Sequence, residues 1–236
     1  MKLSRAALPL PLPLSLLTPA LSALLLLASP AGAATEREWM PYKKLVETIR
    51  LDKFYALPPA ERDKVLVYAR LVPVNKAIAP PEVRLTVVDG ASRTPLPLDA
   101  GGRALIVPNR QWLAADARIL TSLPPGEKMS LSFDLGAVLP DATQWQYATV
   151  MGSVPQANAA IGKVAGALSL FVPSMKSVIF KFDKPAQVTI KSKGGDKRYA
   201  SDARHHVRLK LDGDLLLENP LVTLSERPTE AEIDAQ

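Results

Sequence analysis

The order of hydrophobic and polar residues predicts a helix near the start of the chain. Between residues 41 and 53, apolar side chains recur at the spacing of one face of an α-helix. Pro41 stands at the first helical position, where proline is favoured because the backbone N–H there has no partner within the helix. Residues 34–72 are therefore expected to form an N-terminal helix followed by a lead-in strand over Val65–Leu71.

Residues 73–140 alternate between apolar and polar side chains, which is the period of a strand with one buried face. The clearest strand is Met129–Leu135, where apolar residues alternate with Ser130, Ser132 and Asp134. Short segments of this kind are separated by turns rich in proline and glycine. This spacing predicts an antiparallel sandwich-like region.

Helical spacing returns in residues 141–174. Asp141 is a favourable N-cap for a short helix that extends to Met151. A longer helix is expected over Gln156–Phe171, and Pro173 should stop it. This helical segment would be inserted between the central strands and the C-terminal ones.

Two glycines in the second of these helices, Gly162 and Gly166, are four residues apart. Such a pair lets a helix approach its neighbour closely, and each glycine otherwise destabilises an isolated helix by up to about 1 kcal/mol. The pair is therefore interpreted as a buried packing contact. Insertion at a membrane surface and self-association are the alternatives.

Residues 175–225 are expected to form hairpins. Gly194-Gly195 provides one turn, and Asp212-Gly213 provides a two-residue turn from which Leu215–Leu217 returns. Residues 226–236 are acidic and are predicted to be a disordered tail. The fold class is thus α+β, an antiparallel β-sandwich with hairpins, an N-terminal helix and a helical insertion before the C-terminal strands.

Residues 1–33 have the three-part pattern of a secretory signal peptide. A short positive start is followed by the apolar stretch Ala6–Leu27 and by the small-residue cleavage pattern Ala31-Gly32-Ala33. An uncleaved membrane anchor is the competing interpretation, but four prolines in the stretch disfavour a stable spanning helix. The protein is therefore expected to be exported to the periplasm of a bacterium or secreted, with no transmembrane segment after cleavage.

The composition excludes several kinds of site. The chain has no cysteine, so it holds no disulfide, zinc–thiolate site, iron–sulfur cluster or thiol nucleophile. Aromatic residues make up only 6%, which argues against an aromatic-lined groove for carbohydrate or nucleic acid. Phosphate-binding glycine motifs are also missing. No cofactor and no nucleic-acid partner are expected.

The charge is unevenly distributed towards the C-terminus. Residues 176–210 contain ten basic and three acidic residues, whereas residues 211–236 contain one basic and seven acidic residues. The basic block is interpreted as a binding face for an anionic partner, or as lysines that keep exposed edge strands from pairing with other chains. The candidate binding residues are Lys181, Lys191, Lys193, Lys197, Arg198, Arg208 and Lys210.

The chain contains histidines and carboxylates, which can serve in catalysis, but they do not form a recognisable catalytic motif. His205 and His206 are the only histidines, and neighbours on a strand point to opposite faces, so no metal site is expected. Paired carboxylates for glycoside hydrolysis can be drawn from four acids, and no catalytic residue is assigned. These acids are Asp116, Glu127, Asp134 and Asp141.

Two stretches resemble a family of exported bacterial proteins of unassigned function. The first runs from Met40 to Leu51, and the second combines Glu218-Asn219-Pro220 with Ser225-Glu226-Arg227-Pro228. The resemblance spans most of the chain after residue 33. It implies no activity and assigns no site residue.

The sequence therefore predicts a non-catalytic binding or scaffolding module of the cell envelope that uses a basic C-terminal β face. Its expected partner is an acidic envelope protein, an anionic glycan or an anionic lipid surface. The alternatives are an envelope hydrolase with paired carboxylates and a protein that associates peripherally with membranes.

Overall fold

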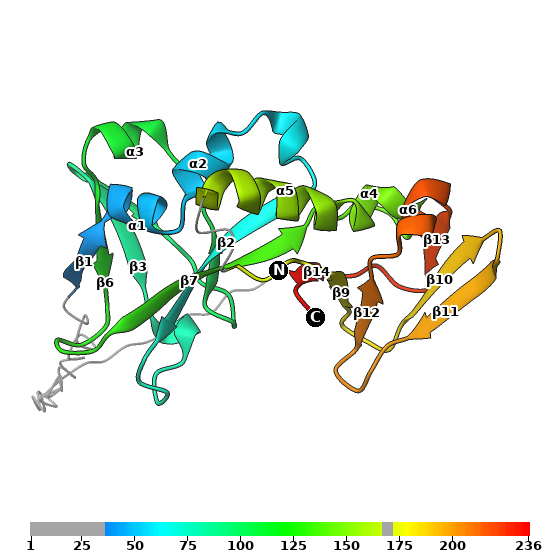
Figure 1. Ribbon diagram of the computed structural model, residues 1–236. Helices are drawn as coiled ribbons and strands as arrows, with labels where there is room; N and C mark the ends of the chain where they lie inside the picture. The colour runs from blue at the N-terminus through cyan, green and yellow to red at the C-terminus, as the bar shows by residue number, and fades with distance from the viewer. Residues whose placement is uncertain (1–35, 167–171) are drawn as a thin grey trace, which may run out of the picture. The chain divides into compact units, whose positions relative to one another are not determined.

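The computed structural model describes residues 36–166 and 172–236, and these form three antiparallel sheets with short helices between them (Figure 1). The α+β prediction, with antiparallel strands and hairpins, is confirmed. The expected signal peptide, residues 1–33, lies outside the described residues. Among the described residues, no helix is long and apolar enough to cross a membrane.

The largest sheet has six strands, in the order β12-β9-β14-β7-β2-β5. Neighbours in this sheet come from distant parts of the sequence, because the C-terminal strand β14 lies between β9 and β7. The strands are β2 (Val65–Pro73), β5 (Arg103–Leu105), β7 (Met129–Ala137), β9 (Ser177–Lys181), β12 (His206–Lys210) and β14 (Glu230–Asp234).

Two four-stranded sheets complete the β structure. One has the order β1-β6-β3-β4 and the other has the order β11-β10-β13-β8. The first contains β1 (Arg37–Pro41), β3 (Leu85–Asp89), β4 (Ser92–Pro95) and β6 (Arg118–Thr121). The second contains β8 (Gln144–Gln146), β10 (Gln187–Ser192), β11 (Gly195–Ala200) and β13 (Leu221–Leu224).

The helices are short, and α5 is the one that lies against the six-stranded sheet. It contacts β2, β7 and α2, as Figure 1 also shows. The α-helices are α1 (Tyr42–Thr48), α2 (Leu51–Ala56), α3 (Arg110–Ala114), α4 (Tyr147–Met151), α5 (Ser153–Ala165) and α6 (Gly213–Glu218), and the 3₁₀ helices are η1 (Pro59–Glu61) and η2 (Pro80–Glu82).

One hydrophobic core runs through residues 36–166 and 172–236, which belong to a single compact unit. Val87 of β3, Val67 of β2, Ile190 of β10 and Val154 of α5 all belong to it. The three sheets therefore share one core, and strands from every segment of the sequence after residue 33 contribute to it. Burial of these side chains is the main favourable term in folding.

The predicted helix over residues 41–53 is divided into α1 and α2. The break is at Arg50, which has a left-handed backbone conformation with φ of 59°. Ile49 and Leu51 are both buried, and residues two positions apart cannot share one face of a continuous helix. The break lets both side chains enter the core.

The first helix of the predicted insertion begins later than expected. Residues 144–146 form strand β8, which pairs with β13, and α4 starts only at Tyr147. Asp141 does not cap a helix, and instead it forms an ion pair with Arg227. The long helix is α5, which begins at Ser153 and ends at Ala165. Residues 167–171 of its predicted range lie outside the described residues.

The interpretation of Gly162 and Gly166 as a buried packing contact is wrong. A Cβ atom added at either glycine would meet nothing within 4 Å. The buried side of α5 is formed by Val154, Ala157 and Ala160, whose small side chains bring the helix close to the core. The two glycines lie on the exposed side of the helix.

The hairpin predicted at Asp212-Gly213 is also wrong, because these residues begin helix α6. The Asp212 carboxylate accepts hydrogen bonds from the backbone N–H groups of Asp214, at 3.0 Å, and Leu215, at 3.1 Å. Aspartate followed by glycine favours both a hairpin turn and a helix N-cap, so the pair alone does not decide between them. The turn at Gly194-Gly195, by contrast, joins β10 and β11 as predicted.

The prediction of a disordered tail at residues 226–236 is wrong, because Glu230–Asp234 is strand β14. Ala231 and Ile233 are buried and alternate with acidic residues, which is the period of a strand. Residues 230–234 pair with β9 along their full length, and Glu232 and Ile233 also pair with β7. The acidic side chains do not prevent folding because basic groups of neighbouring strands face them.

We expect Ile233→Ala to lower the free energy of unfolding by about 3 kcal/mol, because the change removes buried methyl groups from a packed site. Ile179→Ala is the matched control, since Ile179 is half-buried on the opposite face of β9 and should cost roughly 1 kcal/mol or less. Urea unfolding measures both values. If both variants lowered the free energy of unfolding by the same small amount, β14 would not be a core strand.

Candidate functional site

The structure distributes the seven predicted binding residues over two sheets. Three lie in the six-stranded sheet, and four lie on the β10–β11 hairpin of a different sheet. The first group is Lys181, Arg208 and Lys210, and the second is Lys191, Lys193, Lys197 and Arg198. The basic block is therefore not one continuous face.

The cations of the six-stranded sheet lie on the face away from the core. Directly paired residues of antiparallel strands share a face, so Lys181 lies with His206 of β12 and Glu230 of β14. The next residue along each strand points into the core, as Phe180 and Val207 do. One face of this sheet is therefore apolar and buried, and the other carries charges of both signs.

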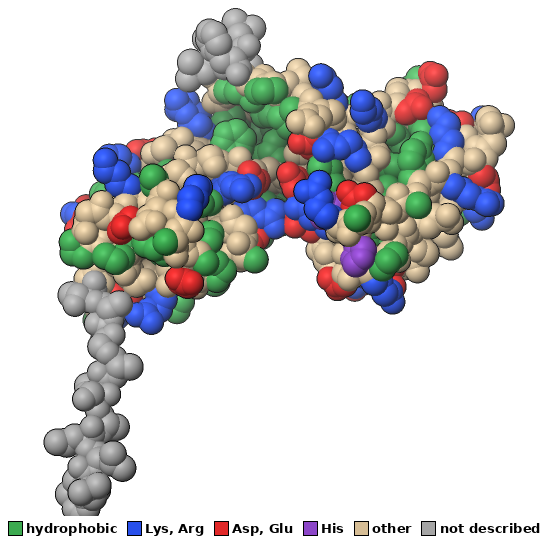
Figure 2. Space-filling view, turned by 90° about the horizontal axis from the view of Figure 1, so that it is seen from below, with side chains coloured by type: hydrophobic (Ala, Val, Ile, Leu, Met, Phe, Trp, Pro, Cys, Tyr) green, Lys and Arg blue, Asp and Glu red, His purple; other side chains and the backbone are tan. Residues whose placement is uncertain are grey.

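Acidic residues of β14 neutralise this charged face. The Lys181 ammonium lies 2.7 Å from Glu232 and 3.3 Å from Glu230, and Arg208 pairs with Asp234. Basic and acidic side chains lie next to one another across the middle of the view in Figure 2. Acids of residues 230–234 therefore neutralise Lys181 and Arg208, two of the three predicted cations on this sheet.

Glu230 is the centre of the network. Arg103 of β5 donates a hydrogen bond of 2.8 Å to it and also contacts the ring of Tyr68, 5.2 Å from its centroid. Burial raises the pKa of Glu230, but the hydrogen bond and charge of Arg103, with Lys181, outweigh burial and hold the pKa below its ordinary value. The carboxylate is therefore ionised at neutral pH.

A cleft of about 490 Å³ lies between β12 and the β10–β11 hairpin, and two of the seven predicted cations, Arg208 and Lys210, line it. Figure 1 shows β11 and β12 diverging from the loop that joins them. Both strands are at the end of the strand order of their sheets, so each has one edge without a neighbouring strand in the described structure. The cleft is lined by Tyr147, Ile190, Tyr199, Arg208, Leu209, Lys210, Leu211, Asp212 and Leu215.

Tyr147 and Asp212 fix the geometry of this cleft. The Tyr147 hydroxyl donates to the carbonyl oxygen of Lys210, at 3.3 Å, and accepts from the backbone N–H of Asp212, at 3.1 Å. Burial raises the pKa of Tyr147, so its hydroxyl stays protonated at neutral pH. The N–H groups at the start of α6 and the ammonium of Lys197, 3.1 Å away, hold the pKa of Asp212 below its ordinary value.

Three of the seven predicted residues keep a free charge. Lys191, Lys193 and Lys210 form no ion pair with any described residue, and all three are exposed. Arg198 is 4.0 Å from Asp196, which is the limit of an ion pair. Of these three lysines, Lys210 lines the cleft, whereas Lys191 and Lys193 lie on the β10–β11 hairpin outside its lining.

The four acids considered for hydrolysis lie on different elements, and each has its own partner. The pairs are Asp134 with Arg70, Asp141 with Arg227, Glu127 with Asn75, and Asp116 with Arg118. No two of these acids share a partner. Nothing in their contacts makes them the paired carboxylates that glycoside hydrolysis requires.

The histidine pair stands at the turn between β11 and β12. Asp202 accepts hydrogen bonds of 2.8 Å from the backbone N–H groups of Arg204 and His206, and His205 has a left-handed φ of 61°. Asp202 thus shapes the turn. Among the described residues, no group of three histidine, cysteine or acidic side chains could hold a metal ion.

Several residues that build these two sites were not predicted from the sequence. Arg103 and Glu230 form the charged network, and Tyr147 and Asp212 shape the cleft. The alternation of Ala231 and Ile233 with acids is the signal that could have located β14. The distant pairing of Arg103 with Glu230 has no such local signal, since 127 residues separate them.

The Glu230 network should make stability depend on pH. Because the pKa of Glu230 is lower in the folded state, its stabilising effect is present at neutral pH and is lost as the pH falls through that pKa. We expect the loss of melting temperature between pH 6 and pH 3 to be roughly 2–4 °C smaller in Glu230→Gln than in the wild type. Calorimetry at both pH values measures it.

The matched control is Glu82→Gln, since Glu82 is exposed on η2 and makes no ion pair with a described residue. This variant should retain the pH dependence of the wild type. A Glu230→Gln variant with unchanged pH dependence would contradict the role of the network.

Comparisons with protein-family models, with curated proteins and with solved structures found no match for this chain.

Proposed function

We propose that this protein is a non-catalytic binding module of the cell envelope, and that it binds an acidic segment of another protein in the cleft between β11 and β12. Export is inferred from the signal-peptide pattern of residues 1–33. The observation that carries the proposal is the combination, in one cleft, of apolar lining residues with Lys210, which has no ion pair among the described residues.

The dimensions of the cleft support binding. Its volume of about 490 Å³ is within the range of about 300–1,000 Å³ that is usual for ligand sites. Tyr199 and Leu211, which are partly exposed, supply apolar contacts, and Lys210 supplies a charge that no described acid neutralises. A ligand with acidic groups beside apolar ones would be complementary to both features.

The edge strands favour an extended peptide as the ligand. β11 and β12 are edge strands, and an edge can hydrogen-bond to an added strand. An extended segment in which acids alternate with apolar residues would direct its apolar side chains to Tyr199 and Leu211 and its carboxylates to Lys210. Lys197 and Arg198 on β11 also keep the edge from pairing with apolar strands.

The contacts of α5 favour this proposal over membrane association. Val154, Ala157 and Ala160 of this helix are buried against the rest of the protein. Its apolar face is thus already used for packing, and the exposed side carries Lys163, which is paired with Glu61 at 2.6 Å. A lipid surface would have little apolar area to contact on this helix.

We expect Lys210→Glu to weaken binding of a labelled peptide of alternating glutamate and leucine by about fivefold, since one favourable charge contact becomes repulsive. Lys44→Glu makes the same change of net charge on α1 and should leave the affinity unchanged. Fluorescence anisotropy in low and high salt measures the affinities, and high salt should weaken wild-type binding.

Equal affinities of the two variants would contradict a binding site at the cleft. Binding of the wild type to vesicles with anionic lipid, or to an anionic polysaccharide, in preference to the peptide would contradict the proposed ligand class. Circular dichroism melting of each variant shows whether the fold is retained.

A further inference from the structure

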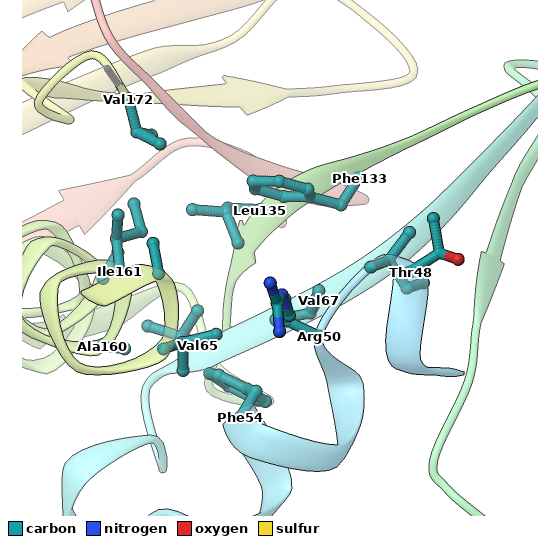
Figure 3. A pocket seen from close by; sticks show the side chains of 14 residues that line it. Thr48, Arg50, Phe54, Val65, Val67, Phe133, Leu135, Ala160, Ile161 and Val172 are labelled. Atoms are coloured by element: carbon teal, nitrogen blue, oxygen red, sulfur yellow. The ribbon is translucent and has the colours of Figure 1, made fainter. Parts of the chain in front are cut away.

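A second pocket lies on the core face of the six-stranded sheet, opposite its charged face. It is between the sheet and helices α1, α2 and α5. Its volume is about 120 Å³, and it is open to solvent at one side. Figure 3 shows side chains of the sheet and of these helices pointing into it. It shares no lining residue with the cleft between β11 and β12.

The lining of this pocket is apolar apart from two residues. Phe54, Val65, Val67, Leu135 and Ile161 are among the side chains that form its walls. Phe133 stands at its edge with 43% of its surface exposed, which is unusual for a phenylalanine on the core side of a sheet. The two polar lining residues are Thr48 and Arg50.

Arg50 has a strained backbone and an unpaired charge. Its φ of 59° lies in the left-handed region, which costs a residue with a Cβ atom roughly 1–2 kcal/mol. Within residues 36–166 and 172–236, its guanidinium has no acidic partner and no hydrogen-bond acceptor. Figure 3 shows its nitrogen atoms beside Val67 in this view, and the side chain as a whole is exposed.

An arginine in this position selects for a ligand with one anionic end. A guanidinium binds a carboxylate through two parallel hydrogen bonds, and the exposed side chain of Arg50 presents its guanidinium at the opening of the pocket. An apolar pocket beside it would take an alkyl chain. For comparison, an apolar cavity of about 150 Å³ holds a benzene molecule, so this pocket accommodates a short chain while the carboxylate remains near its opening.

We propose that this pocket binds a short-chain fatty carboxylate of about six carbon atoms, with its alkyl chain between α5 and the β2–β7 pair and its carboxylate on Arg50. This site is independent of the peptide cleft. Each methylene group that enters the pocket should tighten binding about fourfold. The increase should stop when the chain fills the pocket.

The test is calorimetric titration of the purified protein with butanoate, hexanoate, octanoate and decanoate, and with octanol as the uncharged analogue. The affinity should rise from butanoate to hexanoate and then level off, and octanol should bind about tenfold more weakly than octanoate. No measurable binding of octanoate, or equal affinities for octanoate and octanol, would overturn the proposal.

Two variants separate the charge from the apolar pocket. Arg50→Asn removes the cation and keeps a residue that adopts the left-handed conformation readily, so octanoate should bind about tenfold more weakly while octanol is unaffected. Val164→Phe fills the pocket and should abolish binding of both. Lys43→Asn, an equal loss of charge at an exposed position on α1, should leave both affinities unchanged.

The melting temperature, measured with and without octanoate, provides a second test that does not depend on calorimetric titration. Octanoate should raise the melting temperature of the wild type in proportion to its binding, because a ligand of the folded state stabilises it. The melting temperature of Val164→Phe should not respond to octanoate. A response of the same size in both proteins would place the binding elsewhere and would contradict the proposal.

Discussion

The pairing of β14 with its neighbours holds the six-stranded sheet together. In the order β12-β9-β14-β7-β2-β5, β14 is the strand that hydrogen-bonds to β9 on one side and to β7 on the other. Without it, the sheet would divide into a β12–β9 pair and a β7–β2–β5 group. The last residues of the chain therefore join strands that fold from earlier parts of the sequence.

Charge and burial act together at this strand. Ala231 and Ile233 enter the core, while Glu230 and Asp234 face Arg103, Lys181 and Arg208 on the other side. The acidic end of the sequence thus compensates the basic block that precedes it. Lys210, beside the β11–β12 cleft, keeps a charge that no described acid neutralises, which is why the proposed ligand site is there.

The sequence predicts much of the local structure because alternation and helical spacing are local signals. Strand β7 and the β10–β11 hairpin were located in this way. The class of fold follows from the same patterns. Strand β14 was missed because four acids among residues 226–236 suggest solvation, whereas strand pairing depends on cations that are far away in the sequence.

The candidate sites were less predictable than the fold. The sequence shows that seven cations lie close together along the chain. Their division between two sheets depends on the strand order, which no local pattern contains. The same holds for Arg50, whose conformation results from burying both Ile49 and Leu51. Tertiary packing decides such positions, and helix or strand propensity does not.

Hydrogen exchange at the C-terminus tests the central role of β14 most directly. The amides of β14 that bond to β9 should exchange as slowly as those of β9 itself, since both belong to one cooperative sheet. The comparison requires only the wild-type protein at neutral pH. Exchange of residues 230–234 at the rate of an unfolded chain, with β9 protected, would contradict the account.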